Sequence, residues 1–193
     1  MFFEKPLKHL SDEKLMEKVS EGSARALEEI YQRYSQSLLR YFCRMLWQDR
    51  EKARDFSHDL FVNLCEKPLG FDTKRKFSTW IFSSAHNLCK NEYRRRAFRN
   101  EVHQNCEDQI AISESTTNKL DNQSFQLALE EILKEEDEEA RTIFTLRYEL
   151  EKSFAEIAEV LDCPEGTVKS KLFYLKKRLA TRLDHYKIIL QTD

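Results

Sequence analysis

The chain has 193 residues, of which 40% are hydrophobic and 34% charged, with a formal net charge of −2. This length suits one domain or two small ones. There are only three glycines and three prolines, which, with the Leu, Glu, Lys and Arg content, favours an all-α protein. No apolar run approaches the roughly 18 residues of a membrane span, and the charged N-terminal stretch is not typical of a signal peptide. We therefore expect a cytoplasmic protein without membrane insertion.

Charge is sorted into blocks along the chain. Residues 74–99 and 169–187 are basic, whereas residues 130–139 are acidic. Such blocks indicate the nature of a partner better than the small net charge does. They make nucleic acid a candidate.

The five cysteines stand singly and are odd in number, so we expect reduced thiols rather than disulfides. His103 and Cys106 have the spacing of metal ligands. No second pair accompanies them and the stretch around them is polar, so we expect no metal site and no cofactor.

Two helices are expected at the start of the chain. Ser11 can cap a helix over Asp12 to Ser20, and Ser23 can cap a second that runs to about Trp47. The second helix carries a continuous apolar face, which predicts core packing. That face consists of Ile30, Tyr34, Leu38, Tyr41, Phe42 and Met45.

A third helix is expected from about Arg50 to Cys65. Phe56, Leu60 and Leu64 recur every four residues and should lie in the core. The other side of this helix is polar. Such a face is usually only solvated, but it also suits the docking of a basic partner. It consists of Asp55, His58, Asp59 and Asn63.

The segment 67–76 is predicted to be a loop, because Pro68 and Gly70 interrupt it, and it ends in three cations. A fourth helix follows from Phe77 to about Arg96, with aromatic residues among cations. Cations neutralise phosphates and aromatic faces stack on bases, at about 1–3 kcal/mol per base, so this pattern is typical of single-stranded nucleic-acid binding. Any single aromatic here, Trp80 included, is equally suited to the core.

Residues 98–123 are polar and show no sustained period, which predicts a flexible linker. The expected organisation is two small helical domains, residues 1–97 and 124–193, joined by this linker. Each is small enough to be only marginally stable alone.

The segment from Ser153 to Leu179 predicts a helix-turn-helix. Val168, Leu172 and Leu175 recur on one face of its second helix. Asp162, in the turn, tolerates a left-handed conformation. The remaining surface of the second helix carries cations and hydroxyls, which suits entry into a DNA major groove. A helical hairpin with a merely solvated basic face is the alternative.

Three segments in this order resemble the extracytoplasmic-function (ECF) group of bacterial RNA polymerase sigma factors. DFSHDLFVNL (55–64) is similar to the family's polymerase-binding helix, and FSTWIFSSAHNLCKNEYRRR (77–96) to its promoter-melting helix. EIAEVLDCPEGTVKSKL (156–172) is similar to its upstream-promoter helix. The resemblance covers nearly the whole chain. It implies two helical domains that bind core RNA polymerase, recognise the −35 and −10 promoter elements and open the DNA.

The resemblance also implies roles for particular residues of the first domain. The surface that meets the polymerase would carry Asp55, His58, Asp59 and Phe61. A base flipped from the −10 element would meet Phe71, Asp72 and Thr73, while Trp80 matches a family aromatic that either contacts DNA or packs. The backbone phosphates there would meet Lys74, Arg75, Lys76, Arg94, Arg95 and Arg96.

In the second domain, the resemblance places the −35 element against the second helix of the helix-turn-helix. Lys171 stands where Arg is common in the family, and Lys lacks the planar fork that reads guanine. Phe173 and Tyr174 replace a more polar pair, which leaves open whether each packs or reaches a thymine methyl. The residues concerned are Glu165, Gly166, Thr167, Lys169, Ser170, Lys171, Tyr174 and Arg178.

The family commonly has an anti-sigma partner, so the resemblance implies one here. An ordinary helix-turn-helix regulator that binds duplex DNA without polymerase-dependent melting is the alternative, but such a protein needs no surface for single strands. An enzyme is not expected, because the sequence has no Gly-rich phosphate loop and no Ser/His/Asp arrangement with its usual context.

Overall fold

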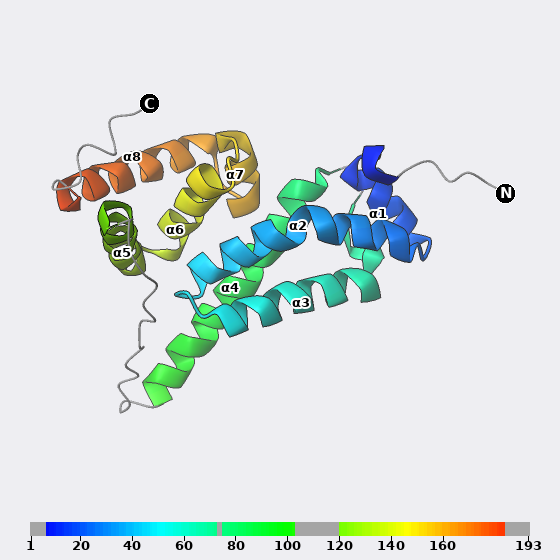
Figure 1. The fold of residues 1–193 in the computed structure, drawn as a ribbon, viewed down its shortest axis with the longest axis horizontal. Coiled ribbons are helices and arrows are strands. Elements are labelled where there is room, and N and C mark those ends of the chain that lie inside the picture. The colour runs from blue at the N-terminus through cyan, green and yellow to red at the C-terminus, as the bar shows by residue number, and fades with distance from the viewer. Residues whose placement is uncertain (1–6, 73–74, 103–119, 184–193) are drawn as a thin grey trace.

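The computed structural model describes residues 7–72, 75–102 and 120–183, and every regular element in these ranges is helical (Figure 1). The expected all-α fold is confirmed. The first domain contains η1 (Leu7–His9), α1 (Asp12–Ser20), α2 (Ala24–Met45), α3 (Arg50–Glu66), η2 (Pro68–Gly70) and α4 (Phe77–Val102). The second contains α5 (Leu120–Glu135), α6 (Glu138–Phe144), the π-helical turn η3 (Thr145–Glu149), α7 (Phe154–Leu161) and α8 (Glu165–Arg182).

The helices of the first domain begin where capping side chains are available. The hydroxyl of Ser11 accepts a hydrogen bond from the Lys14 amide at 3.4 Å, and Ser23 caps α2 through the Ala26 amide at 3.3 Å. A capping oxygen satisfies an amide that has no partner within the helix. The whole predicted apolar face of α2 is buried against α1, α3 and α4.

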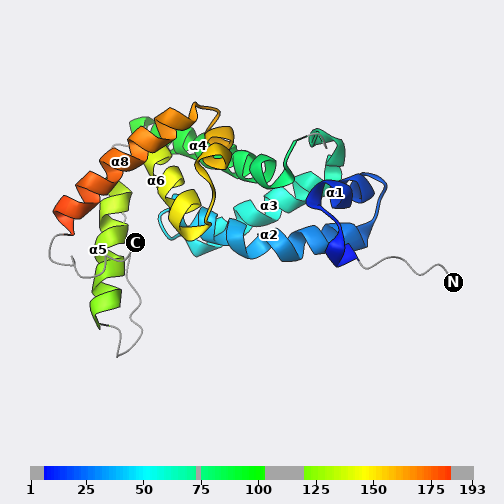
Figure 2. The ribbon, with the colours of Figure 1, turned by 90° about the horizontal axis from the view of Figure 1, so that it is seen from above.

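Helix α4 lies at the junction of the two domains. It packs on α1, α2 and α3 and also receives α7 of the second domain (Figure 2). This double packing explains its composition, because a helix covered from several sides needs apolar residues on more than one stripe. Its buried hydrophobic residues are Phe77, Ile81, Phe82, Ala85 and Cys89.

The second domain is organised around α8, which packs on α5, α6 and α7. Val168, Leu172 and Leu175 are buried as predicted, together with Leu179. Asp162 ends α7 in the left-handed conformation, with φ of 52° and ψ of 49°. The turn geometry expected of this aspartate is confirmed.

Contacts of side-chain hydroxyl groups connect the two domains. The Ser83 hydroxyl donates to the Val160 carbonyl at 2.9 Å, and the Tyr41 and Thr142 hydroxyls lie 3.4 Å apart. Tyr41, which is fully buried, belongs to both the core of the first domain and this junction. The junction therefore has the packed character of a domain interior.

The predicted linker differs from the structure at both ends. Helix α4 continues to Val102 instead of ending near Arg96, and α5 begins at Leu120. His103, Cys106 and the rest of 103–119 lie outside the described residues, as do 184–193. Within the described ranges, no helix is both long and apolar enough to cross a membrane.

Candidate nucleic-acid and polymerase interfaces

The outward face of α8 is the first candidate interface. With 3.6 residues per turn, the surface opposite the buried stripe follows Gly166, Ser170, Phe173, Tyr174 and Lys177. All five are exposed. The structure thus leaves free for a ligand the side of α8 that the helix-turn-helix prediction assigned to DNA.

The cations of α8 divide into two flanks. On one flank, Lys171, Arg178 and Arg182 form ion pairs with Glu139, Glu136 and Glu135 respectively. We call these three glutamates the acidic edge, since they lie together around the α5–α6 connection. Hydrogen bonding to Glu139 is the main reason that the pKa of Lys171 is raised.

The other flank of α8 faces α7. Lys169 pairs with Glu165 at 2.6 Å on the same helix, and its Nζ lies 5.6 Å from the centre of the Phe154 ring. At the helix start, the Thr167 amide donates to the Pro164 carbonyl at 2.9 Å. The Thr167 amide therefore already has a hydrogen-bond acceptor within the protein.

A second candidate interface is a cleft of about 480 Å³ between α4 and α7. Trp80 is half-buried: its ring stacks on Phe77 at 5.7 Å and meets Phe71 at 5.4 Å, and it also lines the cleft. Trp80 thus combines the two roles that the sequence left open, packing and exposure to a ligand. The cleft is lined by Arg75, Lys76, Thr79, Trp80, Ser83, Glu159 and Asp162.

Phe71 is buried beside the cleft. Its side chain is only 5% exposed, because it packs in the aromatic cluster with Phe77 and Trp80. In this arrangement Phe71 therefore supports the wall of the cleft, and its expected contact with a flipped base stays a prediction. Asp72 is exposed beside it, whereas Thr73 and Lys74 lie outside the described residues.

The three arginines near the end of α4 differ in exposure. Arg94 and Arg95 are exposed, but Arg96 stacks on the Trp47 ring at 4.5 Å and donates to Glu92 at 3.2 Å. Arg96 thus packs α4 against the residues that follow α2. Phe98, which the sequence analysis did not single out, is 69% exposed and lies with Arg94 and Arg95 around a shallow surface hollow.

The polar face of α3 is a third candidate interface, where Asp55, His58 and Asp59 are exposed as expected. Phe61 differs from them: it is only 7% exposed and lies under Tyr31, with ring centres 4.8 Å apart, so its expected contact with polymerase stays a prediction.

Two hydrophobic residues beside this face were missed. Tyr31 is 52% exposed and Val62 37%. Tyr31 stands next to the buried Ile30 in sequence, and its exposure is known only from the packed structure.

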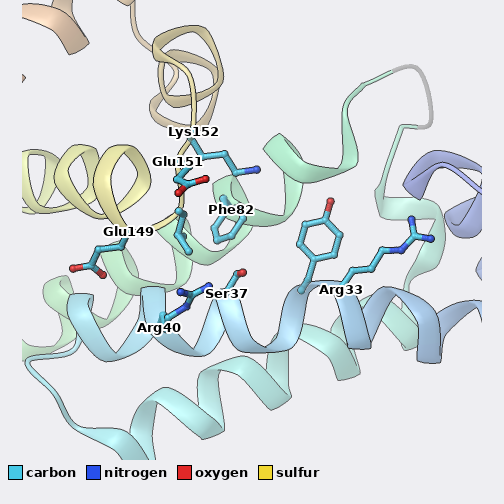
Figure 3. A pocket seen from close by; sticks show the side chains of 9 residues that line it. Arg33, Ser37, Arg40, Phe82, Glu149, Glu151 and Lys152 are labelled. Carbon is cyan, nitrogen blue, oxygen red and sulfur yellow. The ribbon is translucent and has the colours of Figure 1, made fainter. Parts of the chain in front are cut away.

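A polar groove of about 440 Å³ runs along the seam between the domains (Figure 3). Arg33, Ser37 and Arg40 come from α2, Phe82 from α4, Glu149 from the end of η3, and 150–152 from the loop that precedes α7. Arg33 is held by Asp12 at 2.7 Å and by Glu29 at 3.0 Å, so its charge is neutralised within the first domain. No group of three or more potential metal ligands occurs among the described residues.

Comparison with known families identifies both domains. The model of sigma-70 region 2 matches residues 30–99, and that of sigma-70 region 4 matches residues 126–179. SigL of Mycobacterium tuberculosis, an ECF RNA polymerase sigma factor, is 31% identical over 165 residues, which are 84% of this chain and 91% of SigL. The chain belongs to the ECF group of RNA polymerase sigma factors. A sigma factor recognises promoters for RNA polymerase in transcription initiation and has no catalytic activity of its own.

Other relatives of this ECF sigma factor agree. The RNA polymerase sigma-H factor of Pseudomonas aeruginosa is 26% identical over 177 residues, 87% of this chain and 91% of the relative. CnrH, solved with the cytosolic domain of CnrY, superposes with a TM-score of 0.67 at 22% identity, covering 90% of this chain and 97% of CnrH. RpoE of Bartonella quintana, solved with the anti-sigma factor NepR, gives 0.64 at 23% identity, covering 81% and 98%.

Proposed function

We propose that each of the three exposed surfaces makes a different contact in transcription initiation. The outward face of α8 contacts the duplex −35 element. The cleft at α4 and the exposed cations that follow it contact the −10 element as its strands separate. The polar face of α3 docks on core polymerase.

The assignment of α8 is supported by exposure and charge. Ser170, Tyr174 and Lys177 face away from the domain core, and cations lie on both flanks of this line. A helix of this kind places short polar side chains against base edges and cations against phosphates. Glu165, Gly166, Thr167, Lys169, Lys171 and Arg178 complete the proposed −35 surface.

The assignment of the −10 surface is supported by the cleft. Trp80 offers an aromatic face beside Arg75 and Lys76, and these two cations are exposed. Stacking on one such ring and neutralisation of a phosphate are the two interactions that hold an unpaired strand. We extend the surface along α4 through Arg94 and Arg95, and include Asp72, Thr73 and Lys74 from the loop.

The assignment of α3 is supported by its mixed chemistry. Asp55, His58 and Asp59 provide polar and anionic groups, while Tyr31 and Val62 provide apolar area beside them. Aromatic anchors surrounded by polar groups are typical of protein interfaces. This face therefore suits a basic surface on the polymerase.

In the packed arrangement, the −10 surface is partly obstructed. Glu159 and Asp162 of the second domain line the same cleft as Arg75, Lys76 and Trp80. These carboxylates repel phosphates and compete for the cations. We infer that α7 moves away from α4 when the promoter strand enters.

We also propose a cytoplasmic protein with an anti-sigma partner, as RpoE has NepR.

One observation carries the proposal: a single chain exposes both a helix-turn-helix suited to duplex DNA and an aromatic-cationic cleft suited to a single strand. The test uses the purified chain, bacterial core polymerase and a pool of promoter fragments, with permanganate to map unpaired thymines. We expect core-dependent reactivity at a fixed distance from a recurrent upstream motif. Specific duplex binding without core, and without melting, would contradict the proposal.

The polymerase contact is tested separately with Asp55→Asn combined with Asp59→Asn. We expect weaker binding to core polymerase with unchanged helical content. Glu21→Gln combined with Glu28→Gln, at two other exposed positions, is the matched control. Equal binding by the two double variants would remove the α3 face from the interface.

A further inference from the structure

The outward face of α8 carries an aromatic pair, and the proposed −35 role does not say what this pair recognises. Phe173 is 64% exposed and Tyr174 is 58% exposed, although each offers a large apolar surface. Their ring centres lie 5.5 Å apart with the planes at 76°, an edge-to-face arrangement. Neither ring packs in the core, so neither serves the fold in the way that the buried leucines of α8 do.

We propose that Phe173 and Tyr174 read the C5-methyl groups of thymines in the upstream promoter element. This inference rests on the proposed role of α8 and specifies what that helix recognises. Among the groups that a base pair presents in the major groove, the thymine methyl is the apolar one. Phe173 has no hydrogen-bonding group, so it can distinguish base pairs only through such an apolar contact.

The position of the pair favours DNA over a protein partner. Ser170 precedes the rings by one turn of α8 and Lys177 follows by one turn, so the aromatic patch lies in the middle of a polar and cationic surface. The cations Lys169 and Lys176 lie on one flank, and Arg178 lies on the other. A patch bounded by cations on this many sides complements a groove bounded by phosphates.

The edge-to-face contact holds the two rings in one relative orientation. Each ring restricts the rotation of the other, so less side-chain entropy is lost when the helix enters a groove. Successive residues of a helix point about 100° apart, so the two rings face different directions across the groove floor. We therefore expect them to contact methyl groups on different bases.

The experiment replaces single thymines of the upstream motif with deoxyuridine, which removes the methyl group and keeps base pairing. Binding of the complete chain with core polymerase is measured on each fragment. For the unmodified protein we expect about a fourfold loss of affinity at one or two positions, the factor that corresponds to one buried methyl-sized group. Phe173→Ala should bind the thymine fragment more weakly and lose its sensitivity at one of those positions.

Three controls accompany this measurement. Deoxyuridine outside the motif should have no effect, and Tyr148→Ala, which removes another exposed aromatic of the same domain, should keep the full pattern of sensitivity. Tyr174→Phe should keep the sensitivity that Tyr174→Ala loses. Helical content is compared throughout.

Two results would overturn the inference while leaving the role of α8 intact. One is specific binding by the unmodified protein that no deoxyuridine weakens. The other is a Phe173→Ala protein that binds more weakly yet keeps every deoxyuridine effect, which would place the ring against the polymerase. If the unmodified protein with core polymerase bound no upstream motif specifically, the proposed function of α8 would fail too. Failure of the thymine inference can therefore be distinguished from failure of the proposed function.

Discussion

Arg178 of α8 donates a hydrogen bond from Nε to Oε1 of Glu136 at 2.7 Å, and a second hydrogen bond joins Nη2 to Oε2. The fork of the guanidinium is thus occupied by a carboxylate in the way that a DNA phosphate would occupy it. Lys171 and Arg182 are paired with the same acidic edge. If α8 binds the −35 element as proposed, DNA must displace these carboxylates before it meets the three cations.

Glu136→Gln should strengthen binding to the upstream duplex. Without the carboxylate, Arg178 is free to pair with a phosphate, and exposed ion pairs of this kind change affinity by roughly two- to fivefold. Salt titration of duplex binding measures the effect, which should shrink as salt screens the charges. Glu131→Gln is the control, because Glu131 is exposed on α5 and pairs only with Lys134 in the described residues. Weaker binding by Glu136→Gln would show instead that Glu136 orients Arg178 for DNA.

Ser153→Ala should destabilise the second domain by about 1 kcal/mol. Ser153 accepts from the Glu156 amide at 3.3 Å, and Glu156 accepts from the Ser153 amide at 2.9 Å, so two amides at the start of α7 depend on this capping box. Denaturant unfolding measures the loss. Ser170→Ala, at an exposed position inside α8, is the control and should change stability by a few tenths of a kcal/mol at most. Equal stability of the two variants would contradict a role for the cap.

The predictions that succeeded depend on short-range rules. The period of Val168, Leu172 and Leu175 identified the buried side of α8, and a capping serine identified the starts of α1 and α2. The left-handed conformation of Asp162 follows from the tolerance of aspartate for that region. Each of these properties is decided within a few residues of the chain.

The burial of other side chains depends on which neighbour covers them. Phe61 and Phe71 stand in the segments expected to meet polymerase and DNA, yet Tyr31 covers one and Phe77 the other. Arg96 belongs to a run of three arginines, but only its position opposite Trp47 distinguishes it from the exposed pair before it. Helical period gives the direction of a side chain from its own axis and does not give the position of the next helix.

His86 should make stability depend on pH in the mildly acidic range. It lies at the domain junction, 3.4 Å from the hydroxyls of Tyr41 and Thr142. Burial, with a smaller contribution from Lys90, lowers the pKa of His86 to about 4. The imidazole is therefore neutral at pH 7, and its 3.7 Å approach to Glu138 is not an ion pair there.

The sign of the dependence follows from linkage. Below about pH 6.5 the unfolded chain binds a proton at His86 that the folded chain does not bind until about pH 4. The free energy of unfolding should thus fall as pH decreases across this window, by up to about 1.4 kcal/mol per pH unit. Denaturant unfolding at pH 7, 6 and 5 tests this. His86→Gln should show a shallower decline, and the exposed His58→Gln the full one; parallel declines in all three proteins would exclude His86 as the cause.

Arg44 and Glu149 should control how tightly the domains are held together. Nη2 and Nε of Arg44 lie 2.6 Å and 2.8 Å from Oε1 of Glu149, and Nη1 lies 3.6 Å from Glu130. Arg44 is only 13% exposed, so this pair is less screened than a surface ion pair. Arg44→Glu places three carboxylates at one point of the junction. We expect the free protein to expand, with a larger radius of gyration in X-ray scattering.

The reversed pair, Arg44→Glu with Glu149→Arg, should restore the compact form at least in part, since it restores the attraction across the junction. Lys18→Glu changes the net charge by the same amount at an exposed position of α1 and should leave the radius unchanged. Because the packed arrangement places Glu159 and Asp162 in the α4 cleft, Arg44→Glu should also strengthen binding of a single-stranded −10 fragment. Expansion without any gain in strand binding would show that the carboxylates of α7 do not obstruct the cleft.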